Sequence, residues 1–386
     1  MAEKVRVGVI GVGNMGSDHV KNIAGGKQPE MELTAVADID PRKLESAREF
    51  KPDVACFDSA EALIGSGLCD AVIIATPHYL HPPMAIAALN AGLHVMSEKP
   101  AGVYTKQVRA LIEVASHSDK TYAIMFNQRT NCVYRKVREL VQGGEYGALR
   151  RVSWIITDWY RTQAYYNSGG WRATWSGEGG GVMLNQCPHQ LDLWQWICGM
   201  PKKVRAVCHE GKWHDIEVED DVTIYAEYEN GATGTFITST GDCPGTNRLE
   251  LTLDRAKIVV ENDKIKMYVM EKPVSEHLKT AEGGFERNPG AWVDVETDGM
   301  NEQHTGVLKA FAAHILHGAP LIADGAEGIN GLTISNAAFL SSWLNEDVAI
   351  PFDENLFYEL LQQKIAHSTY KKTVVEQTQQ DMSGTF

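Results

Sequence analysis

Two short stretches of the sequence carry side chains that could do acid–base chemistry. In "VMSEKPAG", Glu98 and Lys99 directly follow an apolar run that predicts a buried strand. In "GEGGGVMLNQCPHQLD", Asn185 and His189 lie four residues apart, soon after a triple glycine. Histidine is the usual proton acceptor near neutral pH, and an ammonium group can stabilise negative charge on a reacting oxygen. The second stretch therefore offers a candidate proton acceptor, and the first offers an ammonium group at the end of a strand.

The histidine stretch predicts a helix that begins near Cys187. Pro188 is unfavourable in a helix interior but suits a first turn, so Asn185 should lie just before the helix. His189 and Asp192 would then share one polar face. A lone histidine is more often structural, but one beside an amide and a carboxylate, after glycines that let another molecule approach, is the better candidate for a base.

A glycine pattern near the N-terminus predicts a dinucleotide site. The apolar run "KVRVGVI" leads into "GVGNMG", a G-x-G-x-x-G at the start of a predicted helix. Gly11 permits the tight turn, Gly13 lets a pyrophosphate approach the backbone, and Gly16 lets the helix pack close to the strand. Asp38 ends the next strand, where a carboxylate binds the ribose hydroxyls of NAD and repels the 2′-phosphate of NADP. Arg42, a possible phosphate partner, keeps NADP as a less favoured alternative.

Other polar residues follow the ends of later strands, and ligands of doubly wound sheets bind outside that edge. At that edge we expect Lys99 to face the nicotinamide half of the cofactor. We expect His81 to support its own helix more than to take part in chemistry. The residues expected at the cofactor are Gly11, Gly13, Asn14, Met15, Asp38, Arg42, Thr76, Pro77, His78, His81, Glu98, Lys99, Asn127, Trp171 and Arg172.

An aromatic loop between these stretches predicts a sugar site. "TDWYRTQAYYNSGGWRATWSG" crowds tryptophan and tyrosine among glycine and serine without clear periodicity. Such rings stack on the C–H faces of sugars, although some of them would only pin the loop to the core. The residues expected at the substrate are Lys99, Tyr160, Tyr165, Trp175, Asn185 and His189.

Two domains would position these residues. Over residues 1–127, β-branched runs alternate strictly with helix-length stretches, which predicts a Rossmann domain with a doubly wound parallel sheet. Over residues 128–386, successive strands predict an α+β domain with a large, open, mostly antiparallel sheet. One hairpin carries Asn230-Gly231, a dipeptide suited to a type I′ turn. Helices near the C-terminus should pack back on the first domain, and the final polar residues should fray.

The composition limits the classes of partner. The chain has 386 residues, 44% hydrophobic content and a formal net charge of −14, with scattered basic residues. These values argue against nucleic acid or an anionic membrane as a partner. The N-terminus resembles neither a signal peptide nor a membrane span, so we expect a cytoplasmic enzyme. From the aromatic loop we expect its partner to be a small carbohydrate substrate. The seven cysteines form no CxxC pair, which predicts reduced thiols and no metal site.

Taken together, these motifs resemble the Gfo/Idh/MocA oxidoreductases, which act on sugars and cyclitols. The resemblance rests on "GVGNMG" with Asp38, "ATPHYLH", "EKP" and "GGGVMLNQCPHQLD", and it covers nearly the whole chain. It implies that Lys99 and His189 are the catalytic pair and that the bond before Pro100 is cis. It also implies homodimers or homotetramers formed through the second sheet. The family's usual aspartate is replaced by Asn185, which cannot take up a proton and should orient the sugar hydroxyl.

The resemblance implies NAD-dependent oxidation of a secondary ring hydroxyl, with His189 as general base and Lys99 stabilising the reacting oxygen. The phrase "NQCPHQLDLWQW" is similar to a branch that oxidises glycosides or anhydrosugars, often at C3. Inositol dehydrogenase stays open as an alternative, as does glycoside cleavage by transient oxidation without net redox. A non-catalytic NAD-binding regulator is a further alternative, against which the presence of both catalytic residues argues.

Overall fold

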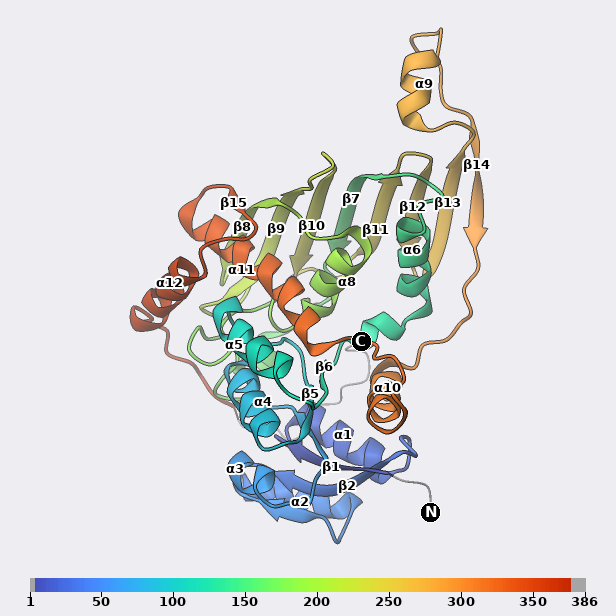
Figure 1. Ribbon diagram of the computed structural model, residues 1–386. Helices are drawn as coiled ribbons and strands as arrows, with labels where there is room; N and C mark the ends of the chain where they lie inside the picture. The colour runs from blue at the N-terminus through green and yellow to red at the C-terminus, as the bar shows by residue number, and fades with distance from the viewer. Residues whose placement is uncertain (1–3, 376–386) are drawn as a thin grey trace.

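The first part of the chain forms a parallel sheet with helices on both faces (Figure 1). The structure is a computed structural model, and it describes residues 4–375. The strand order β3-β2-β1-β4-β5-β6 confirms the doubly wound prediction. The strands are β1 (Val5–Ile10), β2 (Met31–Ala37), β3 (Ala55–Phe57), β4 (Ala71–Ile74), β5 (His94–Ser97) and β6 (Tyr122–Ile124). The helices between them are α1 (Asn14–Ala24), α2 (Pro41–Phe50), α3 (Ala60–Ile64), α4 (His81–Asn90) and α5 (Thr105–Ser116).

Two apolar clusters cover the two faces of this sheet. On one face α3, α4 and α5 pack on the strands, and on the other α1 and α2 are joined by α10 (Gln303–His317). Helix α10 comes from far along the chain, and its Val307 and Phe311 are buried in one cluster with Val7 and Val9. A late segment of the chain therefore completes the core of the first sheet.

The second sheet is larger and mostly antiparallel, as predicted. Its order is β14-β13-β12-β11-β7-β10-β9-β8-β15, and the pair β7 and β10 is parallel. Helices α6 (Cys132–Gln142), α8 (Pro188–Cys198) and α11 (Gly328–Leu344) lie along one face (Figure 1). The strands are β7 (Leu149–Ile156), β8 (Lys203–Glu210), β9 (Glu219–Glu227), β10 (Thr233–Ser239), β11 (Asn247–Leu253), β12 (Ala256–Glu261), β13 (Lys264–Met270), β14 (Gly290–Val295) and β15 (Val348–Ala349).

Aromatic packing fixes α8 on this sheet. The indole of Trp194 stacks on Phe236 of β10, with ring centres 5.3 Å apart, and Trp154 of β7 meets the same phenyl ring edge-on. Helix α11 packs on β8 and α8, while α12 (Glu354–Ala366) contacts α5 of the first domain. The helix that carries His189 is thereby held between the second sheet and α11.

The predicted hairpin is present, but its predicted turn type is wrong. Between β9 and β10, the Tyr228 amide donates to Ala232 O, and only Gly231 of the intervening residues has a positive φ, at 83°. A type I′ turn needs two such residues in succession, so the chain uses a longer loop that ends on glycine. Positive φ values do occur in succession at Asn262 and Asp263, 52° and 56°, between β12 and β13.

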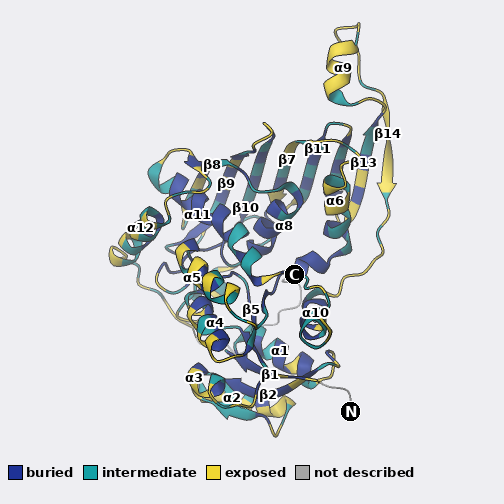
Figure 2. Ribbon diagram, in the orientation of Figure 1, coloured by how far each residue is buried: buried dark blue, intermediate teal, exposed yellow. Residues whose placement is uncertain are grey.

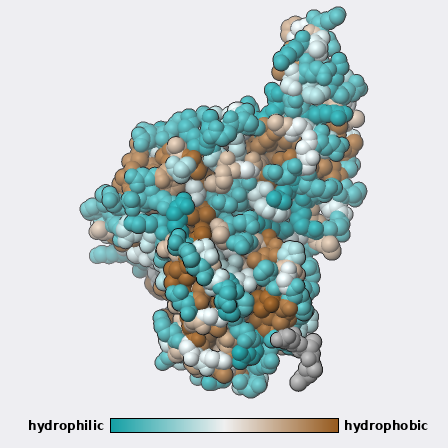
Figure 3. Space-filling view, viewed as in Figure 1, coloured by the Kyte–Doolittle hydropathy of each residue, from teal (hydrophilic) through white to brown (hydrophobic). Residues whose placement is uncertain are grey.

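One corner of the second sheet projects from the molecule. Helix α9 (Val274–Thr280) and strand β14 form this projection, and Figure 2 shows that both are largely exposed while the central strands are buried. The face in Figure 3 mixes hydrophilic and hydrophobic side chains, and the projection around α9 is largely hydrophilic. Among residues 4–375, no helix has the length and apolar character needed to cross a bilayer.

Candidate active site

The carboxyl edge of the first sheet brings the predicted cofactor residues together. Gly11 follows β1, Asp38 follows β2, Thr76 comes shortly after β4, Lys99 after β5 and Asn127 after β6. Strands β1 and β4 are neighbours although two others separate them in sequence, and ligands bind where the strand order reverses in this way. The sheet order therefore places all five positions along one edge.

The glycine loop leaves space on the side where a pyrophosphate would bind. Gly11 has φ of 88°, and a Cβ there would meet Ala75 O at 2.7 Å. A Cβ on Gly16 would meet Gly11 O at 1.8 Å, whereas one on Gly13 would meet nothing within 4 Å. Helix α1 starts at Asn14, next to Met15, and no side chain caps its first amides. The loop fits a dinucleotide, because the open space beside Gly13 adjoins the uncapped N–H groups at the start of α1.

The acidic residue after β2 is held in place by two backbone N–H groups. Asp38 Oδ2 accepts from Val12 N at 2.7 Å, and Oδ1 accepts from Asp40 N at 2.9 Å. Each oxygen keeps a lone pair for a ribose hydroxyl. Arg42 forms an ion pair with Asp40, with Nη2 and Oδ2 2.8 Å apart. Because this ion pair is largely exposed, the preference for NAD rests on Asp38, whose carboxylate would repel a 2′-phosphate.

Two histidines follow β4, and they make different contacts. The buried ring of His81 lies with Nδ1 2.8 Å from Pro100 O and Nε2 2.7 Å from Thr76 O, so it links two strand ends. Pro77 precedes the 3-10 turn η1 (His78–Leu80). There His78 meets Trp171 edge-on at 5.3 Å, and its Nδ1 lies 3.1 Å from Glu178 O.

Lys99 reaches across to the second domain. Its Nζ donates to Asn185 O at 2.9 Å, and the bond to Pro100 is cis, as the resemblance implied. Burial lowers the pKa of Lys99, and the nearby carboxylates of Glu98 and Glu178 oppose that shift. The lysine is therefore a desolvated cation with one donor already aimed at the loop that precedes His189.

Glu98 is buried beneath the lysine and is paired with a histidine. His19 Nε2 donates to Glu98 Oε1 at 2.7 Å, and the Lys99 amide donates to Oε2 at 3.2 Å. Burial by itself would raise the pKa of Glu98, but the hydrogen bond and charge of His19 outweigh it and lower the pKa to about 2. The carboxylate stays ionised and holds the main chain at the lysine.

His189 has the properties of a neutral base. Its side chain lies at the start of α8 and the residue is 4% exposed, yet neither ring nitrogen has a hydrogen-bond partner among the described residues. Burial, followed by the charge of Lys99, lowers the pKa of His189 well below its ordinary 6.5. Thr76 Oγ1 and Asn127 Oδ1 are likewise buried without a partner. Buried polar atoms normally have partners, so these atoms fit bound cofactor and substrate.

A ring of hydrogen bonds surrounds Asn185. Its Oδ1 accepts from the Tyr165 hydroxyl at 3.1 Å, and Arg172 Nη1 donates to the same hydroxyl at 2.8 Å. Its Nδ2 donates to Glu178 Oε1. The guanidinium of Arg172 also lies 4.7 Å from the ring centres of both Tyr165 and Trp171. Asn185, Tyr165, Trp171 and Arg172, which were predicted separately, thus form one connected group.

The triple glycine serves internal packing, which differs from the expected role of admitting another molecule. A Cβ on Gly179 would meet Val103 at 2.2 Å, and one on Gly181 would meet Glu219 O at 2.0 Å. The carboxylate of Glu219 also accepts from Gly181 N at 2.7 Å. The glycines are needed because the loop runs against its own protein neighbours.

Three further residues lie apart from this group. Asp192 is paired with Arg129, with Nη2 and Oδ1 2.7 Å apart, so its carboxylate is occupied. Tyr160 is 48% exposed at the surface. Trp175 is buried edge-on against Phe339. The structure therefore does not bring Tyr160 or Trp175 together with Lys99 through any contact that it describes.

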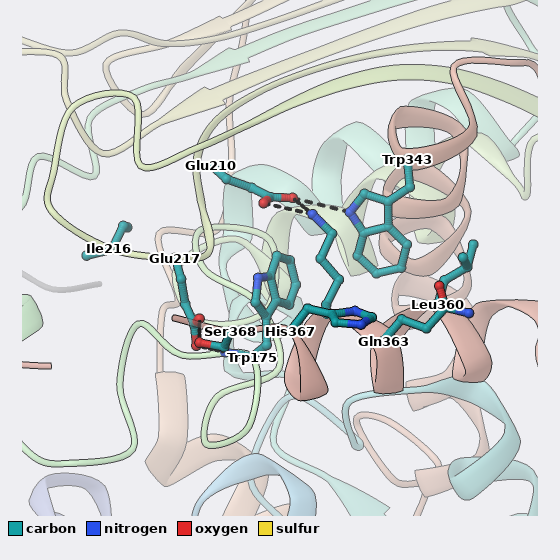
Figure 4. A pocket seen from close by; sticks show the side chains of 10 residues that line it. Trp175, Glu210, Ile216, Glu217, Trp343, Leu360, Gln363, His367 and Ser368 are labelled. Carbon is teal, nitrogen blue, oxygen red and sulfur yellow. Dashed lines mark hydrogen bonds and ion pairs between the residues drawn. The ribbon is translucent and has the colours of Figure 1, made fainter. Parts of the chain in front are cut away.

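Trp175 instead borders a separate cavity of about 570 Å³ (Figure 4). The ammonium of Lys364 lies there 5.5 Å from the ring centre of Trp175 and 5.6 Å from that of Trp343. Lys364 also forms an ion pair with Glu210 at 2.6 Å. The residues that line the cavity are Trp175, Glu210, Ile216, Glu217, Trp343, Leu360, Gln363, Lys364, His367 and Ser368.

Two residues of the site carried little sequence signal. His19 lies within α1, and it meets Glu98 only because the helix packs over the end of β5. Glu178 is the single carboxylate in the glycine-rich run "GEGGG". The signal that could have identified Glu178 was a charged residue within a glycine run, where the chain packs closely and the carboxylate becomes buried.

Two family descriptions match the chain. "Oxidoreductase family, NAD-binding Rossmann fold" matches residues 5–126, and "GFO/IDH/MocA C-terminal domain" matches residues 134–259. The inositol 2-dehydrogenase of Rhizobium meliloti is 25% identical over 87% of this chain and 96% of its own length. The inositol 2-dehydrogenase of Corynebacterium glutamicum is 26% identical over 60% of this chain, and the match spans 66% of that enzyme.

Solved structures share the whole architecture. The WlbA dehydrogenase from Chromobacterium violaceum, in complex with NADH and UDP-GlcNAcA, has a TM-score of 0.79 at 25% identity, covering 92% of this chain and 98% of that one. A levoglucosan dehydrogenase in complex with NADH has a TM-score of 0.75 at 20% identity, covering 91% of this chain and 100% of that one. At 20% identity, the second likeness is one of fold alone.

Proposed function

Since this chain belongs to the Gfo/Idh/MocA oxidoreductase family and has its NAD-binding Rossmann domain, we propose that it oxidises a secondary ring hydroxyl of a sugar, glycoside or cyclitol. The observation that carries the proposal is the pairing of Lys99 with the loop before His189. One group is a partly buried ammonium at the cofactor edge. The other is a buried imidazole, neither nitrogen of which has a hydrogen-bond partner among residues 4–375.

The proposed chemistry divides between these two side chains. NAD, when bound, supplies the hydride acceptor. His189 takes the proton from the substrate hydroxyl, and burial keeps its imidazole neutral and able to do so. Lys99 donates a hydrogen bond to the same oxygen and stabilises the negative charge that develops there. Asn185, fixed by Tyr165 and Glu178, orients the substrate hydroxyl.

We propose the substrate first as a broad class and then as a narrower one. The inositol 2-dehydrogenases among the relatives support a cyclitol or sugar ring with a secondary alcohol. Oxidation at C3 of a glycoside or anhydrosugar is a narrower proposal that rests on the resemblance of "NQCPHQLDLWQW" alone.

A substrate panel tests both levels. NAD reduction is followed at 340 nm, the absorbance band of NADH, with free sugars, methyl and nitrophenyl glycosides, anhydrosugars and inositols. NADH formed in proportion to product supports a dehydrogenase. Nitrophenol released without NADH points instead to glycoside cleavage through transient oxidation, and no turnover across the panel would reject the proposal.

The buried site predicts a pH profile with a broad plateau. The base must be neutral, and because the pKa of His189 is lowered, kcat/KM should fall only well below pH 6.5. The ammonium must be protonated, and because the pKa of Lys99 is lowered, kcat/KM should fall again at a pH below 10.5. Steady-state rates between pH 5 and 10 check both limbs. An acid limb at or above pH 6.5 would contradict the assignment of His189.

The uncovered face of the second sheet supports a homodimer or homotetramer. Val207 is 51% exposed, Tyr225 39% and Ile155 38%. The strand register places Ile155, Thr223 and Val207 in one row across the sheet. Ile237 pairs with Ile155 on one side and with Thr223 on the other, and Thr223 in turn pairs with Val207. We propose that a second copy covers this face, since exposed apolar residues in register suit self-association.

Substitution of Val207 tests this surface. Val207→Asp should shift the protein toward monomer, because a paired interface would bury the new charge. Light scattering coupled to size-exclusion chromatography measures the mass at micromolar concentration. Leu68→Asp, an exposed position in the first domain, is the matched control and should leave the mass unchanged. A monomeric wild-type protein would overturn the proposal.

A further inference from the structure

Glu178 is a buried carboxylate that the proposed mechanism has used only as a support. It is 2% exposed and lies at the start of the glycine-rich loop that leads to Asn185. Its Oε1 accepts from Asn185 Nδ2, and its Oε2 accepts from Ala173 N at 2.6 Å. Arg172 Nη1 lies 4.0 Å from Oε1. Burial raises the pKa of Glu178, while the charge of Arg172 and the hydrogen bonds from Ala173 N and Asn185 oppose that shift. Each oxygen faces an N–H donor and a cation is near, and both favour the ionised carboxylate.

This carboxylate determines which way the carboxamide of Asn185 faces. The amide nitrogen points to Glu178, while Oδ1 accepts from the Tyr165 hydroxyl at 3.1 Å and from Gln186 Nε2 at 3.3 Å. A flipped carboxamide would place its NH₂ against the NH₂ of Gln186 and its oxygen against the carboxylate. Asn185 therefore has one stable orientation, and Glu178 enforces it.

The same carboxylate acts on the lysine through its charge. Burial lowers the pKa of Lys99, and the carboxylates of Glu98 and Glu178 counter that effect. Glu98 is shared with His19, and Glu178 lies near Arg172, whose charge lowers the pKa of Lys99. Glu178 is the carboxylate on the Asn185 side, where the lysine ammonium donates to Asn185 O at 2.9 Å. A desolvated cation needs a counter-charge nearby to stay protonated.

We propose that Glu178 is a positioning residue that supplies, one hydrogen bond behind Asn185, the buried negative charge that an aspartate at position 185 would carry itself. The chain thus keeps a carboxylate in the site although Asn185 replaces the usual acid. The kinetic part of this inference rests on the proposed function, but its electrostatic part depends only on Lys99 and Glu178.

Three variants separate charge from shape. Glu178→Gln removes the charge and keeps the size, Glu178→Asp keeps the charge, and Glu178→Gln with Asn185→Asp moves the charge to position 185. Glu217→Gln is the matched control, because Glu217 accepts from Trp175 N at the same loop and lies in the separate cavity. Thermal unfolding of each variant confirms that it folds.

The first readout is the titration of Lys99 itself, followed by ¹³C NMR of lysine labelled at Cε and assigned with Lys99→Arg. The titration should move to lower pH by about one unit or more in Glu178→Gln, the size of shift expected from losing an opposite charge nearby. It should return toward the wild-type value in the double variant and stay there in Glu178→Asp. Equal titration in wild type and Glu178→Gln would overturn the inference.

The second readout is the alkaline limb of kcat/KM. It should move to lower pH in Glu178→Gln, by the same amount as the NMR titration, and recover in the double variant. A double variant no better than Glu178→Gln would contradict the role of position 185 as the alternative site of the charge. Absence of turnover in the wild-type protein would reject the proposed function, while the NMR titration would still decide the role of Glu178. If Glu178→Gln fails to fold, the double variant is compared with the wild type. A Lys99 titration near the wild-type value supports the inference, and a clearly different value contradicts it.

Discussion

Replacing Lys99 with alanine is expected to lower kcat by about a hundredfold to a thousandfold, the usual cost of removing one donor to a developing oxyanion. The ammonium is desolvated, and its reach to Asn185 O places it between the cofactor edge and the loop of His189. NAD binding should change little, because the glycine loop and Asp38 are untouched. Stopped-flow turnover and NADH fluorescence titration measure the two effects separately.

A matched lysine provides the control for that substitution. Lys106 is exposed on α5 and donates to Asn355 at 2.9 Å, so Lys106→Ala should leave both turnover and NADH binding near wild-type values. Lys99→Ala with unchanged turnover would remove Lys99 from the mechanism. A loss of NADH affinity as large as the loss of turnover would assign the lysine to cofactor binding instead.

Replacing His189 with glutamine should lower kcat by about a hundredfold to ten-thousandfold, the range over which a positioned general base contributes. Glutamine keeps a polar side chain in the buried space but cannot accept the proton. Because the base is lost, the acid limb of the pH profile should also disappear. Steady-state kinetics across pH 5 to 8 measures the rate and the limb together.

His117→Gln is the control for the histidine variant. His117 is exposed at the end of α5, and its Nδ1 lies 2.8 Å from Glu113 O of the same helix. This control should keep both the rate and the acid limb. An acid limb that persists in His189→Gln would assign the base to another group, and a normal rate would remove His189 from the chemistry.

The fold could be predicted well because its signals are local. Short β-branched runs predicted the strands of the first sheet, and alternating runs predicted those of the second. Three strands have weak local signals in the sequence: β3 has three residues, β15 has two, and β14 is largely exposed. The prediction of a type I′ turn after β9 was wrong, because the preference of the Asn-Gly dipeptide does not determine the length of the loop.

The sequence also identified the candidate reacting residues. Lys99 and His189 stand in motifs whose residue types indicate candidate chemistry. The structure places Lys99 after β5, at the edge of the first sheet, and joins it to Asn185, four residues before His189. The role of each residue remains a proposal that the substitutions above test.

What the sequence determined by itself was the order of strands and helices and the residues able to transfer a proton. Only the tertiary structure decided their partners: His19 for Glu98, 79 residues apart, Lys99 for Asn185, 86 apart, and Glu178 behind Asn185. It also separated Trp171, at the site, from Trp175, in another cavity. The physical reason is that hydrogen bonds and burial between distant segments depend on how two domains pack, and no periodicity along the chain records that packing.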